Sequence, residues 1–279
     1  MASSHITKNL QVLLIVLLGT VLLGSTVKAQ AGSCSVCKPD ECCSQYGYCG
    51  KNASFCGEGC QAGPCLNPTN GVSVGDLVTP QFFNGIANKG KANNKDCPGQ
   101  NFYSRGVFLE ALKSYPRFGR TGSVDDSKRE IAAFFAHITH ESGYFCYMEE
   151  TGNKNNNYCD QKRAAEYPCA PGKRYNGRGP LQLTWNYNYG AAGKDNNFDG
   201  LKSPEIVSTN PLVSFKAALW FWMKNVRPFI SQGFGATIEK INGDVECKNK
   251  EPIKVRSRID LYKNYCSQFG VAPGGNLSC

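Results

Sequence analysis

The sequence predicts two folded parts, a small disulfide-rich module followed by a larger domain that contains helices. Eight of the fifteen cysteines fall within residues 34–65. A polar segment rich in turn-forming residues follows at 66–75. Helix signals lie beyond it, beginning at Thr79-Pro80, where a capping residue precedes a proline. We therefore expect a module at residues 32–65, a linker at 66–75 and a larger domain at 76–279.

Residues 1–29 predict a signal peptide. An apolar run at 10–23 is interrupted only by Gln11, Gly19 and Thr20, and small residues follow near Ala29. The run is shorter than the roughly 20 apolar residues that cross a membrane. We expect the segment to be removed, which leaves a secreted protein without a membrane anchor.

The cysteine-rich part predicts a disulfide scaffold, because so many cysteines in a short secreted segment usually replace a hydrophobic core. Zinc is the rival explanation for clustered cysteines. The adjacent pair Cys42-Cys43 and the absence of a nearby histidine do not fit a zinc finger.

Four residues of this module are candidates for a sugar-binding surface, namely Ser44, Tyr46, Tyr48 and Phe55. Exposed aromatic rings can stack on the apolar faces of sugar rings, with a hydroxyl beside them. The same aromatic residues could instead form the small core of the module. Composition alone does not separate these two interpretations.

The segment 127–139 predicts an amphipathic helix, with Ser127 and Glu130 as its capping box and an end near Gly143. Glu141 then lies at the helix C-terminus, where unpaired carbonyl groups oppose ionisation. The aromatic residues that follow should add desolvation, and both effects raise the pKa of a carboxyl group. Such a carboxyl group suits general acid catalysis, although an exposed helix-end residue is the alternative.

The histidines nearby do not predict a metal site. His137 and His140 are three residues apart, whereas a zinc-binding helix places its two histidines four apart. The third histidine, His5, lies within the predicted signal peptide. We expect no metal and no cofactor.

A second carboxylate follows closely, at Glu149 or Glu150, after Cys146. Two carboxyl groups in different environments are the minimal equipment for hydrolysing a glycosidic bond. The sequence does not say which of the two glutamates points inward.

Two later segments have different expected roles. Residues 169–190 are rich in glycine, aromatic rings and amides, which suits a polysaccharide groove but also a buried turn region. Residues 210–225 begin with Asn210 and Pro211 and are apolar on nearly every side, which predicts a core helix. Trp220 and Trp222 should therefore pack in the core.

At this point two family resemblances become specific. The order of the eight cysteines and the string CCSQYGYCG resemble the hevein-type chitin-binding module. HESGYFCYMEE, YPCAPGKRYNGRGPLQLTWNYNYG, KAALWFWM, INGDVEC and RIDLYKNYC resemble the plant chitinases of glycoside hydrolase family 19. The compact spacing and the N-terminal module resemble class IV of that family. The second resemblance covers almost all of the mature chain and implies a mainly α, two-lobed, lysozyme-like fold.

The resemblance also implies roles for individual residues. Glu141 would be the general acid and Glu150 the general base of an inverting endochitinase, with Thr184 helping to hold the attacking water. Ser44, Tyr46, Tyr48 and Phe55 would contact N-acetylglucosamine in the module. The other implied groups are the substrate-binding residues His140, Gln182, Tyr187, Asn188 and Asn242 and the acid-orienting pair Glu246 and Arg258.

The implied disulfides leave Cys266 free. The pairs are Cys34–Cys43, Cys37–Cys49, Cys42–Cys56, Cys60–Cys65, Cys97–Cys146, Cys159–Cys169 and Cys247–Cys279. The sequence departs from the family pattern at Phe55, where tyrosine is usual, and at Asp244, which adds a charge near the groove.

Charge adds one further expectation about partners. Lys and Arg outnumber Asp and Glu by 31 to 22. No nucleic-acid motif accompanies this excess, so we expect attraction to acidic wall polymers or simple solubility. The expected protein is a monomer in the extracellular space (apoplast) that acts on chitin and chitooligosaccharides of the fungal cell wall in defence. The competing hypotheses are a chitin-binding lectin with an inactive large domain and a lysozyme-like peptidoglycan hydrolase.

Overall fold

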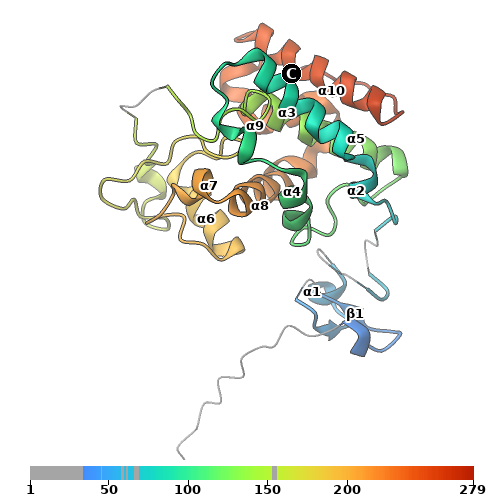
Figure 1. Ribbon diagram of the computed structural model, residues 1–279. Helices are drawn as coiled ribbons and strands as arrows, with labels where there is room; N and C mark the ends of the chain where they lie inside the picture. The colour runs from blue at the N-terminus through green and yellow to red at the C-terminus, as the bar shows by residue number, and fades with distance from the viewer. Residues whose placement is uncertain (1–33, 45, 58–59, 61, 66–68, 153–155) are drawn as a thin grey trace, which may run out of the picture.

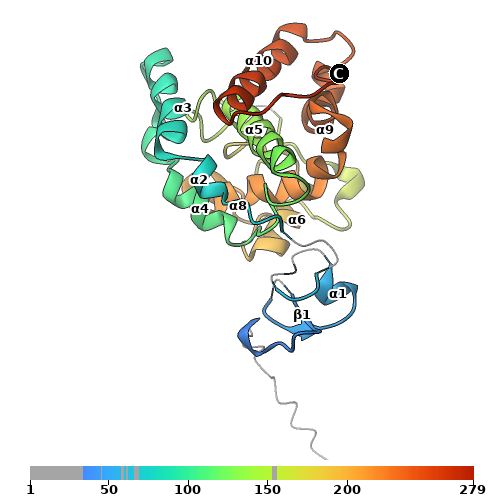
Figure 2. The ribbon, with the colours of Figure 1, turned by 90° about the vertical axis from the view of Figure 1, so that its right-hand side faces the viewer.

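A computed structural model describes residues 34–44, 46–57, 60, 62–65, 69–152 and 156–279 (Figure 1). The predicted signal peptide, residues 1–29, lies outside the described residues. The described chain forms a small module and a larger helical domain, which are separate in both ribbon views (Figures 1 and 2).

The module is held by disulfides rather than by an apolar core. A short 3-10 helix at Cys34–Val36 comes first. Strand β1 (Cys42–Cys43) then pairs antiparallel with β2 (Cys49–Gly50), and helix α1 (Ala53–Cys56) follows β2. Its buried cluster contains Cys42, Cys56 and Cys60, with Phe55 packed against them. Four disulfides join the eight cysteines.

The large domain begins before the predicted boundary at Asp76. The Asn70 side chain donates to the carbonyl oxygens of Gly122 and Ser123 and to Ser127 Oγ, the last at 2.7 Å. Helix α2 (Val74–Leu77) follows at once, and Val74 is buried. The second half of the expected linker is therefore attached to the domain, because its polar groups find backbone partners there.

Helix α5 (Val124–Glu141) is the centre of the domain. It runs beside α10 (Pro252–Gln268), and every residue from Glu130 to Thr139 is buried. The predicted capping box at Ser127 and Glu130 is wrong. Ser123 and Asp126 form it instead, while Ser127 and Glu130 are buried inside the helix. The helix ends as predicted before Gly143, which has a positive φ of 57°.

The other helices pack around α5 in two groups. A large core includes aromatic side chains of α3, α5, α8 and α10, and a smaller one lies under α6, α7 and α8. The remaining helices have these bounds: α3 Pro80–Asn93, α4 Arg105–Leu112, α6 Asn186–Asn196, α7 Ile206–Thr209, α8 Pro211–Phe221 and α9 Phe234–Glu246. Four short helical segments lie at Pro98–Asn101, Gln161–Arg163, Trp222–Val226 and Arg227–Gln232.

The predicted fold class is confirmed, since the domain is mainly α with two cores and follows a disulfide-rich module. Trp220 and Trp222 pack in the core, where their ring nitrogens donate to Asp195 and Glu130. The large domain has three disulfides, Cys97–Cys146, Cys159–Cys169 and Cys247–Cys279. Cys266 is free and buried, and burial raises the pKa of its thiol to about 11.

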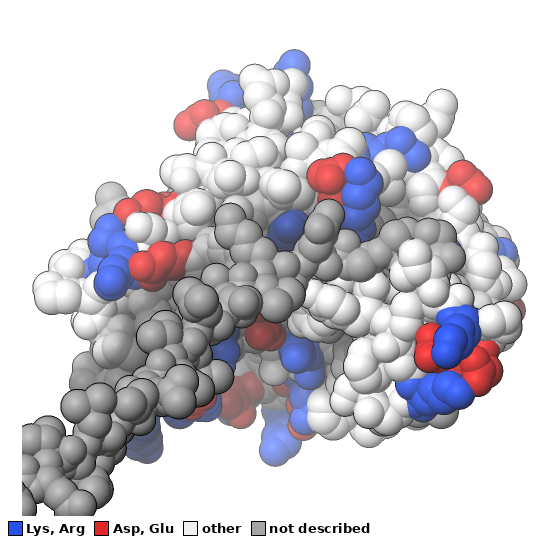
Figure 3. All heavy atoms as spheres, turned by 90° about the horizontal axis from the view of Figure 1, so that it is seen from below, with Lys and Arg blue, Asp and Glu red and all other residues white. Residues whose placement is uncertain are grey.

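The surface does not carry one unbroken basic patch on the face shown in Figure 3. There, Lys and Arg side chains lie beside Asp and Glu side chains in several places. Within the described residues, no helix is both long enough and apolar enough to cross a membrane.

Candidate active site

Glu141 is the last residue of α5, and the chain turns sharply after it. Gly143, Tyr144 and Phe145 all have positive φ values, between 57° and 67°. The Ser142 hydroxyl accepts from Phe145 N at 2.9 Å and stabilises this turn. Cys146 then anchors the loop to Cys97. The turn brings the following segment, with its second carboxylate, back along the domain.

Arg258 of α10 connects Glu141 with Glu246 of α9. Its Nε and Nη2 donate to the two Glu246 oxygens, each at 2.7 Å, and Nη2 also donates to Glu141 Oε1. Burial lowers the pKa of Arg258, but the two carboxylates beside it raise it, and the net shift is upward. Burial raises the pKa of Glu246, yet its bonds from Arg258 outweigh burial and hold it below the usual range. A fixed positive charge thus lies directly behind Glu141.

His137 extends this network to α9. The Thr237 hydroxyl donates to the Phe234 carbonyl at 2.6 Å, so it accepts from His137 Nε2 at 2.8 Å. The proton therefore sits on Nε2, and His137 Nδ1 accepts from Arg258 Nη1 at 3.2 Å. Burial, with the Arg258 charge, holds the pKa of His137 well below its ordinary value. This neutral imidazole orients the guanidinium.

His140, next to Glu141, is also kept neutral. Burial is the main cause that lowers its pKa to about 4, and the Arg258 charge adds to it. Its Nδ1 lies 3.2 Å from Ser257 Oγ on α10. His140 can therefore offer a neutral hydrogen-bonding group beside the candidate acid.

Glu149 and Glu150 have different surroundings. Glu149 pairs with Arg178 at 2.9 Å and also accepts from Asn176 and, at 3.4 Å, from Ser208. Glu150 accepts from the Tyr158 hydroxyl at 2.8 Å, while Gly177 N lies 3.4 Å from its other oxygen. The Glu149 carboxylate is thus engaged by an arginine, an amide and a hydroxyl. The Glu150 carboxylate has fewer close partners and can accept further hydrogen bonds, for example from a water molecule.

The segment after Arg178 supplies a hydroxyl and amides. The Thr184 hydroxyl donates to the Gln182 carbonyl at 2.8 Å, so its oxygen remains available as an acceptor. Gln182 has a positive φ of 51°, and its side-chain amide donates to Gly179 O. Asn188 donates to the Thr184 carbonyl at 2.8 Å. An antiparallel bridge from Arg178 joins this turn to Glu149 and therefore to the second carboxylate.

The aromatic residues of this segment lie close together. Trp185 is 37% exposed, stacks on Tyr187 at 6.4 Å between ring centres, and meets Tyr158 edge-on. Arg163 lies over the other ring of the stack, 5.0 Å from the Tyr187 ring centre. Tyr158 and Trp185 were not among the sequence-predicted residues. Trp185 could have been noticed as an aromatic residue directly after Thr184.

Asn242 lies at a break in α9. Its φ and ψ of −148° and 29° are not helical, and its amide donates to Glu246 Oε1 at 2.8 Å. The predicted residues around Glu141, namely His140, Asn242, Glu246 and Arg258, thus belong to one connected group. Asp244 is exposed, and Lys250 donates to its backbone carbonyl rather than to its carboxylate. The Asn242 amide donates to Glu246, and among the described contacts no hydrogen bond joins it to the Asp244 carboxylate.

Within the described part of the chain, no three His, Cys, Asp or Glu side chains are grouped so as to hold a metal ion. Two carboxyl groups in unlike settings, one backed by arginine and one by a tyrosine hydroxyl, suit proton transfer at a glycosidic bond.

The four predicted module residues have unequal exposure. Tyr46 is 65% exposed and Tyr48 is 39% exposed, so both rings face solvent. Ser44 is buried, and its hydroxyl oxygen accepts from Tyr48 N at 3.2 Å. Phe55 packs against Gly50 and is half-buried. The interpretation as a small core therefore applies to Phe55, while sugar binding by the exposed rings of Tyr46 and Tyr48 stays a prediction.

Comparisons with known proteins find two matching family profiles and close relatives. The profile of a glycoside hydrolase family described as class I chitinase matches residues 77–232 and 227–279. A profile described as chitin recognition protein matches residues 27–65. Endochitinase EP3 from Arabidopsis thaliana is 53% identical over 281 residues, which cover 100% of both chains. Chitinase 5 from Oryza sativa subsp. japonica is 50% identical over 275 residues, 93% of this chain and 94% of its own.

Solved structures are similar over the large domain. A family 19, class IV chitinase from Zea mays matches with a TM-score of 0.69 and 50% identity, over 74% of this chain and 98% of its own. Chitinase C from Streptomyces griseus matches with a TM-score of 0.65 and 35% identity, over 75% of this chain and 100% of its own. Each covers about the length of the helical domain.

Proposed function

The chain belongs to the glycoside hydrolase family 19 chitinases and is an endochitinase with a chitin-binding module, and we propose that it cleaves β-1,4-N-acetylglucosamine linkages with inversion. In this proposal Glu141 is the general acid and Glu150 the general base. The observation that carries it is the contrast between the two carboxyl groups, one held by Arg258 and the other by Tyr158.

The acid step leaves a negative charge on Glu141, next to the Arg258 guanidinium. Glu141 gives its proton to the glycosidic oxygen as the bond from that oxygen to the anomeric carbon breaks. Glu141 is then a carboxylate, and the buried Arg258 guanidinium stabilises it. Glu246 and His137 hold the guanidinium in place from its other sides.

The base step uses a water molecule on the opposite face of the sugar. Glu150 takes a proton from this water as the water oxygen forms a bond to the anomeric carbon. The Thr184 oxygen can accept the other water hydrogen, because its own proton is directed to Gln182 O. Gln182, Tyr187, Asn188 and Asn242, with His140, are our candidates for contacts to sugar hydroxyl and N-acetyl groups.

The test compares Glu141→Gln with the native enzyme on chitin and on soluble oligosaccharides. We expect turnover to fall by about 10²- to 10⁴-fold, since the proton donor is lost, while oligosaccharide binding persists. Glu110→Gln is the matched control, because the exposed Glu110 side chain pairs with the exposed Lys113 on the surface of the domain. NMR of the first product formed should show the inverted anomer, and a retained anomer would contradict the mechanism.

Two other functions make different predictions in the same assays. A chitin-binding lectin would bind chitin and release no oligosaccharides from it. A lysozyme-like enzyme would lower the turbidity of a bacterial wall suspension. We expect release from chitin and little clearing of peptidoglycan.

We further propose that the enzyme is a monomer exported to the apoplast, where it attacks fungal walls in defence. The support is the leader-like sequence at 1–29 and seven disulfides, which persist in oxidising compartments. Fractionation of a tissue that expresses the chain should find it in the wall fluid, and size-exclusion chromatography should give one chain per particle.

A further inference from the structure

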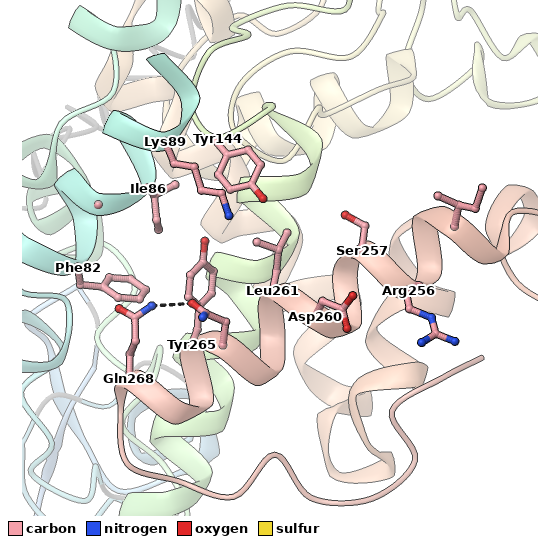
Figure 4. Close-up of a pocket in the computed structure, with 13 residues that line it drawn as sticks. Phe82, Ile86, Lys89, Tyr144, Arg256, Ser257, Asp260, Leu261, Tyr265 and Gln268 are labelled. Carbon is pink, nitrogen blue, oxygen red and sulfur yellow. Dashed lines mark hydrogen bonds between the residues drawn. The ribbon is translucent and has the colours of Figure 1, made fainter. Parts of the chain in front are cut away.

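A groove of about 680 Å³ lies between α3 and α10, and neither Glu141 nor Glu150 lines it (Figure 4). Its volume is within the range of about 300–1,000 Å³ that is usual for ligand pockets. Gly85 and Lys89 of α3 line one side and Ser257 and Asn264 of α10 the other, and Tyr144, from the turn after α5, also lines the groove. None of the residues assigned above to catalysis or sugar binding lines it.

Two residues that line the groove adjoin residues of the candidate active site. Tyr144 is the third residue after Glu141 and belongs to the same sharp turn. Ser257 precedes Arg258 on α10, and its hydroxyl lies 3.2 Å from Nδ1 of His140. The part of the groove lined by Ser257 therefore lies beside His140, the neighbour of Glu141.

The chemistry of the lining suits a neutral, hydrogen-bonding polymer with apolar faces. The Tyr144 ring is held by Lys89, whose Nζ lies 5.0 Å from the ring centre (Figure 4). Gln268 donates to Asn264 Oδ1 at 2.7 Å, which leaves Asn264 Nδ2 and Gln268 Oε1 to bond a ligand. Basic side chains, at Lys89 and Arg256, and an acidic one, at Asp260, are all present in the lining, which therefore carries charge of both signs.

We propose that this groove binds the part of a chitin chain that extends beyond the cleavage site on the Glu141 side. The proposal rests on the endochitinase function proposed above and deepens it. Sugar residues would stack on Tyr144 and bond the exposed amides of Asn264 and Gln268, so oligosaccharides long enough to reach the groove gain affinity. The groove is thus an extension of the substrate site that favours long chains.

A single glycine allows the groove to be filled without disturbing the core. Gly85 is an exposed residue of α3, and a Cβ built there meets nothing within 4 Å. Gly85→Tyr should therefore occupy the groove while improving the helix propensity of α3. Gly106 of α4 also has open space at its Cβ, is exposed and does not line the groove. Gly106→Tyr is the matched control.

The experiment measures kcat/KM for chitotetraose and chitohexaose and compares their ratio among the variants. We expect Gly85→Tyr to lower the value for the hexamer by about fivefold, as the loss of a few surface contacts would, and to leave the tetramer unchanged. Gly106→Tyr should change neither. An unchanged hexamer-to-tetramer ratio in Gly85→Tyr would overturn the proposal.

A binding measurement separates failure of the groove from failure of the proposed function. In a Glu141→Gln background, calorimetry should show weaker chitohexaose binding with Gly85→Tyr than with Gly106→Tyr. If the native chain hydrolyses no oligosaccharide, the proposed function fails, yet this comparison still decides the groove. Equal affinities in the two variants would reject it.

Discussion

Glu149 and Glu150 are neighbours in the sequence with different partners in the structure. We expect Glu150→Gln to reduce turnover by about 10²-fold or more, because the candidate base is lost. Glu149→Gln should keep most turnover but lower stability by roughly 1 kcal/mol, since the buried Arg178 loses its charged partner. Chitin hydrolysis and thermal melting of the two variants measure this. Equal loss of turnover in both would contradict the assignment.

The lowered pKa of His140 should make the stability of the fold depend on pH. Its pKa is about 4 in the folded chain and near 6.5 as a free side chain, so the unfolded state binds more protons between these values. The stability that neutral His140 contributes is therefore full above pH 6.5 and is lost as the pH falls toward 4. The loss amounts to at most roughly 3 kcal/mol.

The measurement is the free energy of unfolding from urea titrations at pH 7.0 and pH 4.5. His140→Gln removes the titrating group and keeps a polar side chain, so the difference between the two pH values should shrink. His137 still titrates in this variant, which therefore retains part of the dependence. If the native chain and the variant lose equal stability, His140 is not the cause.

At the residue scale, local sequence patterns predicted where a residue lies in its helix better than they predicted which residues it contacts. Glu141 was expected at a helix C-terminus and lies there. Its contact with Arg258, 117 positions away, followed from the family resemblance and from no local signal. The tautomer of His137 depends on Thr237, 100 positions away, and could not be read from spacing.

At the scale of elements, the start of α5 shows a different limit. Ser127 and Glu130 satisfy the capping-box pattern, but so do Ser123 and Asp126 four residues earlier. The earlier pair forms the cap because the buried stripe of α5 includes Ser127 and Glu130, which find tertiary partners in Asn70 and Trp222. Tertiary packing therefore determines which of the two capping-box patterns begins the helix.

His137 of α5 connects Thr237 of α9 with Arg258 of α10. Thr237 is therefore a positioning residue, because it orients the His137 ring that in turn holds the Arg258 guanidinium. Thr237→Val keeps the shape of the side chain but removes the acceptor for His137 Nε2–H. We expect kcat to fall several-fold and stability to fall by about 2 kcal/mol, since two buried hydrogen bonds are lost, one from His137 and one to the Phe234 carbonyl. Thr237→Ser should restore both, because it restores the hydroxyl.

A readout specific to this role is the tautomer of His137. Nitrogen NMR of histidine-labelled protein should show the Nε2–H form in the native chain and in Thr237→Ser. In Thr237→Val we expect a mixture of tautomers, with a pH profile of kcat that differs from the native one. A native-like spectrum together with native kcat would show that Thr237 has no such part.

At the scale of the whole molecule, the module and the domain should be separable in function. Deleting residues 32–65 should leave hydrolysis of soluble oligosaccharides nearly unchanged. Hydrolysis of insoluble chitin should fall by about tenfold, because a tethered module raises the local concentration of the enzyme at the polymer. Tyr46→Ala with Tyr48→Ala should have the same effect, since both exposed rings are removed.

The two variants are compared by sugar release from chitin powder and by the amount of protein bound to it. A Lys38→Ala variant, changed at another exposed position of the module, is the control. If the shortened enzyme binds and degrades the powder as well as the full chain, the module does not act as an anchor.

The division into two parts could be predicted because cysteine density and turn composition are local properties of the sequence. The exact start of the domain could not, because Asn70 is attached through bonds to Gly122 and Ser123, which are about 50 residues away. The groove beside α3 is likewise formed by helices from opposite ends of the domain.

The anchoring of Asn70 also determines how far the module can travel. Only five peptide steps separate Cys65 from Asn70, and a fully extended chain spans roughly 3.6 Å per step, or about 18 Å in all. Once the module rests on chitin, the domain is confined to a small search volume around that point. Its cleavages should therefore cluster in short tracts along a fibre, and the enzyme must release its module before it can begin a new tract.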